Sequence, residues 1–259
     1  MRAERRSRVR PLYRLVQIAL FYLMLLWLGT MLLLGNVACL PLVFAPRAWR
    51  EALLQDLISR TFRLFLDGCS ACGLMRLDLG AIDALNDSRQ MLLVANHPSM
   101  IDVFLVISRV RRAVCLMKAG IGSNAFLAVG ARLAGYISNR STSQMIRDAT
   151  EAVSQGRLLL AFPEGTRTTV QPMNRLKPGV ALVAKRARAP LQLILIETNS
   201  PYLSQGWKIW RPPQFPLVYK LSLGERVQPA ATVAETVERL QHAFDARLCC
   251  SIAPGLTLD

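Results

Sequence analysis

Short apolar runs alternate with helical patterns along most of this chain, and this alternation constrains the fold more than any other feature. The runs predict strands at 91–95, 113–117, 158–162, 191–196 and 217–223, and the amphipathic segments predict helices at 101–110, 124–134, 143–155, 178–187 and 233–248. Nearly continuous apolar strands separated by helices are typical of a parallel sheet with both faces covered. We therefore predict an α/β fold with a largely parallel central sheet and helices on both faces.

A long uncharged stretch follows a basic N-terminus. Residues 2–14 carry six arginines against one acid, and no charged residue occurs from 15 to 46. A helix needs about 20 apolar residues to cross a bilayer core, whereas the apolar part of a cleaved signal peptide has only about 7–15. The sequence therefore predicts a retained hydrophobic helical membrane anchor within residues 1–46.

Basic residues flank this stretch on both sides, because Arg47 and Arg50 follow it directly. Such flanks favour the cytoplasmic face, so both ends of the stretch are expected there. Gly35-Asn36, Pro41 and Pro46 supply turn residues within it. Two short helices that enter one leaflet and return satisfy both flanks and are the favoured arrangement. A single span satisfies only the first flank and stays the alternative.

The rest of the chain divides into three parts. Residues 47–75 place apolar side chains at helical spacing and predict an amphipathic connector. Residues 76–250 hold the strands and helices of the main domain, and 251–259 form a tail. No internal repeat or low-complexity linker interrupts the domain.

The charge and composition of the chain limit the kinds of partner that it can bind. A net charge of +15 favours a polyanionic neighbour, either nucleic acid or an anionic membrane surface. The chain is 52% apolar but only 7% aromatic, and it holds no nucleic-acid recognition motif, so we expect the membrane surface and no nucleic acid. The cysteines lack the paired spacing of a zinc site, apart from a lone Cys69-Ser70-Ala71-Cys72. We expect reduced thiols, with neither a metal ion nor a cofactor.

A polar motif, Asn96–Asp102, directly follows the predicted strand 91–95. In α/β folds the loops at the ends of buried strands carry the chemistry. His97 can take a proton near neutral pH, and Asp102 could orient its ring. On one helix the two side chains would lie about 140° apart, so they meet only if His97 is in the loop and Asp102 in the first helical turn. A capped helix with a structural histidine is the alternative.

A second polar motif, Phe162–Arg167, follows another predicted strand. Gly165 permits a tight turn, and Thr166 and Arg167 offer a hydroxyl and a planar bidentate donor for a phosphate. Glu164 could brace either the arginine or the histidine, or bind an acceptor hydroxyl. A surface turn with an ion pair is the alternative. A base beside an anion site suggests transfer of a group onto the hydroxyl of a phosphorylated acceptor.

These motifs resemble those of the glycerolipid acyltransferases, over about residues 75–225. Asn96-His97 with Asp102 resembles the family's Asn-His-x-x-x-x-Asp signature, and Phe162–Arg167 resembles the block that binds the acceptor's phosphate. Gly135–Arg140 resembles an intermediate block, and Ala189-Pro190-Leu191 a fourth. Two departures stand out: Asn139 replaces an acid before the arginine, and Lys118–Ile121 replaces a Lys-x-Glu-Leu sequence.

The resemblance implies transfer of a fatty acyl group from an acyl carrier protein or acyl-CoA thioester to the free hydroxyl of 1-acyl-sn-glycerol-3-phosphate, giving phosphatidic acid. His97 would be the general base and Asp102 its orienting partner. The acceptor would contact Asn96, Arg140, Glu164, Gly165, Thr166 and Arg167. We further expect a bacterial inner-membrane location, with the catalytic domain facing the cytoplasm.

Direct attack is expected, because no Gly-x-Ser-x-Gly elbow occurs to support an acyl-enzyme. Backbone amides near Pro98 or Gly165 are the candidates for an oxyanion stabiliser. The departures leave room for another lysolipid acceptor, such as lyso-ornithine lipid, or for an unusual acyl chain. A non-catalytic membrane-binding protein is the alternative from a different class.

Overall fold

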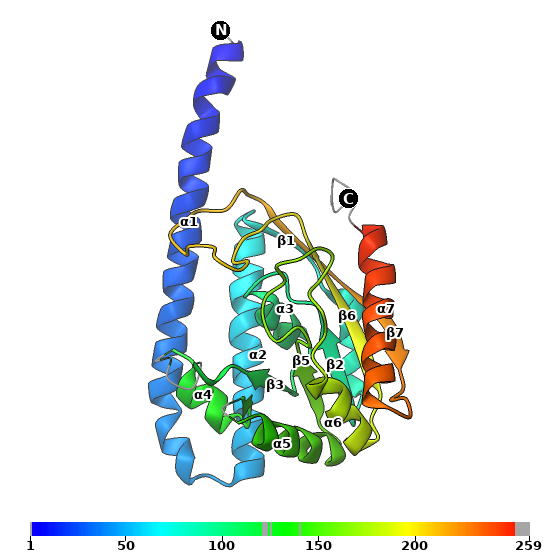
Figure 1. Ribbon diagram of the computed structural model, residues 1–259. Helices are drawn as coiled ribbons and strands as arrows, with labels where there is room; N and C mark the ends of the chain where they lie inside the picture. Colours follow the sequence, from blue (N-terminus) through cyan, green and yellow to red (C-terminus); the bar gives the residue numbers. More distant parts are fainter. Residues whose placement is uncertain (1, 121–123, 125, 140, 252–259) are drawn as a thin grey trace.

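A seven-stranded sheet organises the chain downstream of its N-terminal helices. The computed structural model describes residues 2–120, 124, 126–139 and 141–251 (Figure 1). The strand order is β1-β7-β6-β2-β5-β3-β4. The strands are β1 (Met75–Asp78), β2 (Met91–Ala95), β3 (Ala113–Met117), β4 (Ile137–Ser138), β5 (Leu158–Ala161), β6 (Leu191–Thr198) and β7 (Leu217–Val227).

Five of the strands run parallel. β2 pairs in parallel with β5 and β6, and β3 pairs in parallel with β5 and β4. β7 is antiparallel to β6, and β1 is parallel to β7, so these two strands at one end of the sheet run the other way. The predicted, largely parallel sheet is therefore confirmed, and all five predicted strands are present. β1 and β4 were not predicted, because runs of four and two residues are too short to show a period.

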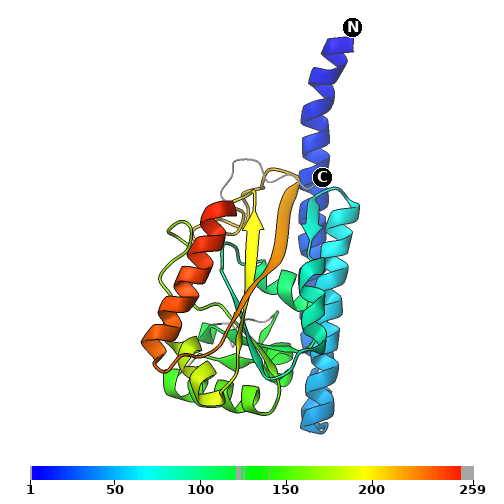
Figure 2. The ribbon, with the colours of Figure 1, turned by 90° about the vertical axis from the view of Figure 1, so that its right-hand side faces the viewer.

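Helices cover both faces of the sheet (Figures 1 and 2). The helices are α1 (Arg2–Ala38), α2 (Arg47–Ala71), α3 (Asp102–Arg109), α4 (Ala128–Leu133), α5 (Thr142–Ser154), α6 (Gly179–Ala187) and α7 (Val233–Ser251), with 3-10 turns η1 (Leu40–Phe44) and η2 (Gly80–Asp87). The five helices predicted in the main domain correspond to α3–α7. α2 and α3 pack on one face, with α1 outside α2, whereas α5, α6 and α7 pack on the other.

The two-residue period of the buried strands divides the core into two layers. Leu93 and Ala95 of β2 face the layer of α2 and α3, whereas Leu92 and Val94 face α5, α6 and α7. All five residues of β2 are buried. Burial on both faces explains why these strands are continuous apolar runs rather than alternating ones.

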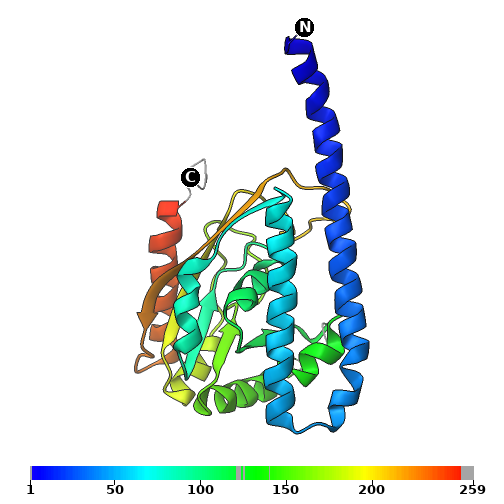
Figure 3. The same ribbon diagram turned by 180° about the vertical axis from the view of Figure 1, so that it is seen from behind.

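The N-terminal helices differ from the favoured prediction. α1 is one continuous helix that passes through Gly35 and Asn36, so the prediction of two short helices within the uncharged stretch was wrong. A glycine inside a helix costs only about 1 kcal/mol. The Asn36 side chain accepts a hydrogen bond from the Gly130 backbone at 2.7 Å, so it docks α4 rather than breaking α1. The chain turns after Cys39 and returns as α2 (Figure 3).

α1 has one face on the domain and one face uncovered. Phe21 and Leu28 are buried against the core, whereas Leu23, Leu26 and Leu34 are more than half exposed. Within the described residues, Leu12–Ala38 is the one helical stretch long and apolar enough to cross a membrane, with a mean hydropathy of 2.2. The expected N-terminal apolar helix is therefore present.

Candidate functional site

The two polar motifs meet at the carboxyl ends of two neighbouring strands. β2 pairs with β5, with Val94 opposite Ala161, so the loops that follow them emerge side by side. The His97 backbone amide donates to Glu164 Oε1 at 2.9 Å, and the Thr168 amide donates to the His97 carbonyl at 2.7 Å. The His97 ring stacks on Phe162, with ring centroids 4.1 Å apart. The two motifs therefore form one rigid site.

His97 lies in the loop after β2, and Asp102 lies in the first turn of α3. Their side chains meet, with Nδ1 of His97 2.8 Å from Oδ2 of Asp102. The backbone N–H of Ser99 donates to the same Oδ2 at 2.8 Å, which fixes the carboxylate at the start of the helix. This is the arrangement that the spacing required.

Burial sets the electrostatics of this pair. The carboxyl of Asp102 is fully buried, which raises its pKa to about 6, although the hydrogen bond and charge of His97 oppose the shift. Above that pH the ionised carboxylate accepts the Nδ1 proton of His97, and Nε2 carries the lone pair. Nε2 has no hydrogen-bond partner among the described residues, and the ring is 16% exposed. The histidine can therefore accept a proton from a bound molecule.

Glu164 is a structural clamp rather than an open ligand. Only 1% of the residue is exposed, and its oxygens accept from the His97 amide, the Thr168 hydroxyl and the Asn174 amide. These contacts join the loop after β2 to the loop after β5. Of the roles considered for Glu164, bracing the histidine fits, and contact with an acceptor hydroxyl does not.

Asn96 also differs from its expected role as a substrate ligand. Its Nδ2 donates to the Ile196 carbonyl at 2.9 Å, and its Oδ1 accepts from the Ile196 amide at 2.8 Å. The residue is only 4% exposed. Both ends of the amide are used to extend the pairing of β2 with β6, so these contacts make Asn96 a support for the loop that carries His97.

Gly165 and a lysine that the sequence reasoning missed lie together. Gly165 has φ +69°, and a Cβ there would lie 2.8 Å from Nζ of Lys177. Within the described part of the chain, this ammonium has no ion pair or hydrogen bond. Lys177 lies directly before α6 in the sequence Lys-Pro-Gly. A cation next to the start of a helix is the one feature of the sequence that could have pointed to it. Lys177 is thus a candidate ligand for an anion beside Gly165.

The side chains of Arg167 and Thr166 already make hydrogen bonds within the protein. Nη1 of Arg167 donates to the carbonyls of Leu203 and Ser204 at 2.8 and 3.0 Å. The Thr166 hydroxyl lies 3.3 Å from Oε1 of Gln205. The other guanidinium nitrogens make no hydrogen bond to described residues. Arg167 therefore keeps part of its donor set for an anion while anchoring the segment after β6.

The intermediate block is only partly visible. Arg140, expected to help hold the acceptor, lies outside the described residues. Its neighbour Asn139 accepts a hydrogen bond from the Ala119 amide at 2.7 Å and donates its own amide to the Met117 carbonyl. The asparagine therefore ties β4 to the loop after β3, a role that an acid could also fill.

Two of the backbone amides considered for an oxyanion are already engaged. The Gly165 amide donates to the Phe162 carbonyl at 3.0 Å. Pro98 has no N–H, and the amide of the next residue, Ser99, is held by Asp102. These two amides therefore cannot also serve an oxyanion, and the neighbouring amides of Thr166 and Arg167 stay candidates.

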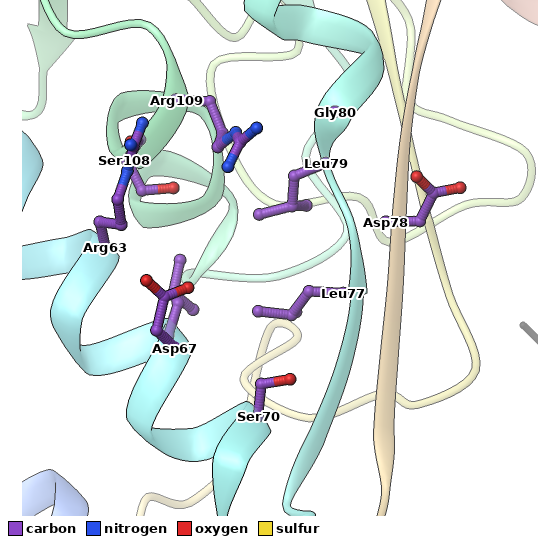
Figure 4. A pocket seen from close by; sticks show the side chains of 10 residues that line it. Arg63, Asp67, Ser70, Leu77, Asp78, Leu79, Gly80, Ser108 and Arg109 are labelled. Carbon is purple, nitrogen blue, oxygen red and sulfur yellow. The ribbon is translucent and has the colours of Figure 1, made fainter.

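Two cavities of the described structure lie away from this site. One, of about 280 Å³, is lined by α2, β1 and the end of α3; Figure 4 shows Leu77 and Leu79 pointing toward α2 and Asp78 pointing away. Another, of about 720 Å³, lies at the amino ends of β2 and β5 and is lined by residues such as Arg111 and Arg157. Neither is lined by His97 or Glu164, so the candidate site is the loop cluster at the opposite, carboxyl end of the strands.

The sequence and the fold of this chain are similar to those of known proteins. Residues 76–197 match the family model described as Acyltransferase. A lyso-ornithine lipid O-acyltransferase of Rhizobium meliloti is 29% identical over 156 residues, which cover 58% of this chain and 49% of that protein. The Caenorhabditis elegans protein acl-1, provisionally named a 1-acyl-sn-glycerol-3-phosphate acyltransferase, is 23% identical over 199 residues, 73% of this chain and 72% of its own. The chain thus spans about half the length of the first of these relatives.

A solved structure has the same fold. The crystal structure of the 1-acyl-sn-glycerophosphate acyltransferase PlsC from Thermotoga maritima aligns with a TM-score of 0.66 over 96% of this chain and 100% of that chain, at 18% identity. The matching domain, the order of the motifs and this shared architecture lead to one conclusion. Residues 76–197 therefore form an acyltransferase domain, and the chain is similar to the glycerolipid acyltransferases in its motifs and its fold.

Proposed function

We propose that this protein transfers a fatty acyl group from a thioester to the free hydroxyl of a lysolipid. The observation that carries the proposal is the His97–Asp102 pair, 2.8 Å apart, held on a loop clamped to the Phe162–Arg167 motif in an acyltransferase domain. A positioned base suffices for this chemistry, because a thioester is already an activated acyl donor.

In the proposed step, Nε2 of His97 takes the proton of the acceptor hydroxyl as its oxygen attacks the thioester carbonyl carbon. A carbon–oxygen bond forms, the carbon–sulfur bond breaks, and the proton on Nε2 passes to the departing thiolate. Asp102 holds the ring and stabilises its transient positive charge. General-base assistance contributes about two to four orders of magnitude in rate.

The preferred acceptor in this proposal is 1-acyl-sn-glycerol-3-phosphate. The ammonium of Lys177 and the uncommitted guanidinium nitrogens of Arg167 supply cationic donors suited to a phosphate. A second acceptor, lyso-ornithine lipid, is supported by the relative that carries that name. An ornithine headgroup has no phosphate. Binding of lysophosphatidate should therefore depend on these cations more than binding of lyso-ornithine lipid does.

The donor is proposed to be an acyl carrier protein or acyl-CoA thioester, and the location a bacterial inner membrane with the catalytic domain facing the cytoplasm. We further propose that α1 lies along one leaflet. Its residues from Leu20 onward pack on the domain, which leaves about eight residues of the apolar stretch, 12–19, or about 12 Å, beyond it. A bilayer core is about 30 Å thick. Residues 1–46 then form the anchor, 47–75 the connector and 76–250 the catalytic domain.

The decisive assay supplies purified protein with radiolabelled acyl carrier protein and acyl-CoA donors and a panel of lysolipids, including lysophosphatidate and lyso-ornithine lipid. We expect product with at least one lysolipid, and a loss of kcat/KM of at least about 100-fold in His97→Ala. His242→Ala, which changes the other histidine of the chain, is the matched control and should retain full activity. Equal activity of the two variants would remove the base from the mechanism.

The acceptor is identified by a second pair of variants. Lys177→Gln should raise KM for lysophosphatidate about tenfold, with little change in kcat, because it removes a charge that binds the phosphate in both ground and transition states. Arg175→Gln, two residues away and also exposed, should change KM by less than twofold. An unchanged KM in Lys177→Gln would remove Lys177 from the acceptor site, and turnover of lyso-ornithine lipid alone would make that lipid the acceptor.

A further inference from the structure

The segment between β6 and β7, residues 199–216, crosses the N-terminal helix. We call this segment the strap. In Figure 1 it runs as a yellow and orange loop across α1. The Tyr22 hydroxyl on α1 donates to the Trp210 carbonyl at 2.8 Å, and Phe21 packs edge-on against Tyr202, with ring centroids 5.4 Å apart. These two contacts therefore fix the strap to α1 at the level of Phe21 and Tyr22.

The tip of the strap, Lys208–Arg211, has an unusual exposed composition. Ile209 is 55% exposed and Trp210 is 70% exposed, and a cation stands on each side of them. Nζ of Lys208 lies 5.6 Å from the Trp210 ring, and the guanidinium of Arg211 lies 4.7 Å from the Trp207 ring. Indoles and cations side by side are typical of the interface between lipid headgroups and acyl chains.

This tip continues the uncovered face of α1. Leu23 and Leu26, next to the Tyr22 contact along the helix, are 54% and 68% exposed. An apolar stripe followed by indoles and then cations matches the order of layers met on leaving a bilayer core. An acidic protein would suit Lys208 and Arg211 but would not compensate for the exposed Ile209. A lipid surface accounts for all of these features.

The strap is also bonded to the candidate active site. Arg167 donates to the Leu203 and Ser204 carbonyls, and the Met100 amide donates to the Leu203 carbonyl at 3.1 Å. The Ser99 hydroxyl donates to the Tyr202 carbonyl at 2.8 Å. One end of the strap is thus bonded to both polar motifs, and its tip reaches the outer side of α1.

We propose that the tip of the strap inserts into the headgroup layer of an anionic bilayer, and that this contact holds the Phe162–Arg167 loop in place for a membrane-embedded acceptor. The inference rests on the proposed function for its second part only. Lipid contact at the tip is transmitted through the strap backbone to Arg167. An acceptor dissolved in water does not need this contact.

The first test measures the position of Trp210 in the full chain, reconstituted into phosphatidylcholine vesicles with and without phosphatidylglycerol. The emission difference between the wild type and Trp210→Phe reports this indole alone. We expect it to be quenched more strongly by lipids brominated near the headgroup than by lipids brominated near the chain end, and more in anionic vesicles. Emission from Trp210 that bromine does not quench would overturn the proposal, whatever the enzyme activity.

The second test compares two acceptors, one embedded in anionic vesicles and one of short chain length in water. Lys208→Gln/Arg211→Gln and Ile209→Asp/Trp210→Ser should each lower kcat/KM about tenfold for the embedded acceptor and less than twofold for the soluble one. Arg111→Gln/Arg112→Gln removes the same charge at the amino end of the sheet and should change neither value.

Equal losses on both acceptors would indicate a structural role for the strap. A loss confined to the KM of an acyl carrier protein donor would indicate protein docking. Either result overturns the proposal. If the wild type acylates no lysolipid, the proposed function fails while the quenching measurement still decides the position of the strap.

Discussion

At the scale of single residues, the site depends on one buried carboxylate. Asp102 accepts hydrogen bonds from His97 and Ser99 through Oδ2, whereas its Oδ1 is buried without a hydrogen-bond partner among the described residues. An acid in such a place is costly to ionise, and its pKa rises to about 6 because of burial. Ionised Asp102 therefore lowers the stability of the folded protein, but it supplies the negative charge that orients His97.

The activity should fall in acid for this reason. Protonation of Asp102 removes the acceptor that orients Nδ1, so kcat/KM should decline about tenfold per pH unit below about pH 6. The Asp102→Asn variant should be at least about 100-fold less active at pH 8 and should lose this acidic limb. A pH profile of kcat/KM for both proteins measures the effect, and an identical limb in Asp102→Asn would assign it to another group.

The raised pKa of Asp102 also makes the stability of the fold depend on pH, in the direction opposite to that of the activity. The pKa of Asp102 in the folded protein lies above the unfolded value of 3.8, so its contribution to stability is largest below that value and is lost as the pH rises through about 6. The melting temperature of Asp102→Asn relative to wild type should therefore increase between pH 5 and pH 8. A difference that shrinks over this range would contradict the assigned direction of the shift.

At the scale of elements, two loops act as one because of Glu164. Parallel pairing of β2 and β5 brings the loops together, and the carboxylate of Glu164 binds three donors across them. The strap adds a third segment through Arg167. The site is therefore assembled from the ends of three adjacent strands, β6, β2 and β5.

Glu164→Gln should loosen this assembly. The amide group places N–H donors where a buried carboxylate oxygen accepted, and an unsatisfied buried group costs about 1–3 kcal/mol. We expect a lower melting temperature and a kcat lower by about tenfold or more, because His97 loses its backbone anchor. Glu235→Gln, an exposed partner of Arg239 on α7, is the control and should change both values little. Full activity in Glu164→Gln would show that the clamp is not needed.

At the scale of the whole molecule, α1 and α2 form a hairpin beside the sheet rather than a separate anchor (Figures 1 and 3). The inner face of α1 completes the core through Phe21 and Leu28. Pulling α1 away to span a bilayer would expose this core. The fold thus favours a helix that lies in the membrane plane with its uncovered apolar face toward the lipid.

Membrane topology can be measured by labelling from one side. In a background without the native cysteines, Tyr13→Cys and Ala48→Cys place single thiols at the start of α1's apolar stretch and after its end, both at exposed positions. In sealed vesicles an impermeant maleimide should label both from the same, cytoplasmic side. Labelling from opposite sides would establish a span and refute the in-plane arrangement.

The sequence by itself determined the layered core and the location of the chemistry. The strands β2, β3 and β5 were predicted nearly to the residue, because burial on both faces requires continuous apolar runs. The spacing of His97 and Asp102 allowed one geometry for contact, and the structure has it. These features depend on residues close together in the chain, where a local pattern carries the information.

Only the tertiary structure decided what the polar side chains around the base do. Asn96 bonds a residue 100 positions away, Glu164 reaches back 67 positions to His97, and Arg167 binds the strap 36 and 37 positions on. The same is true of α1, whose Asn36 docks α4 where the sequence predicted a turn. Hydrogen bonds over such separations form only after the sheet has brought the strand ends together, so no local pattern could specify them.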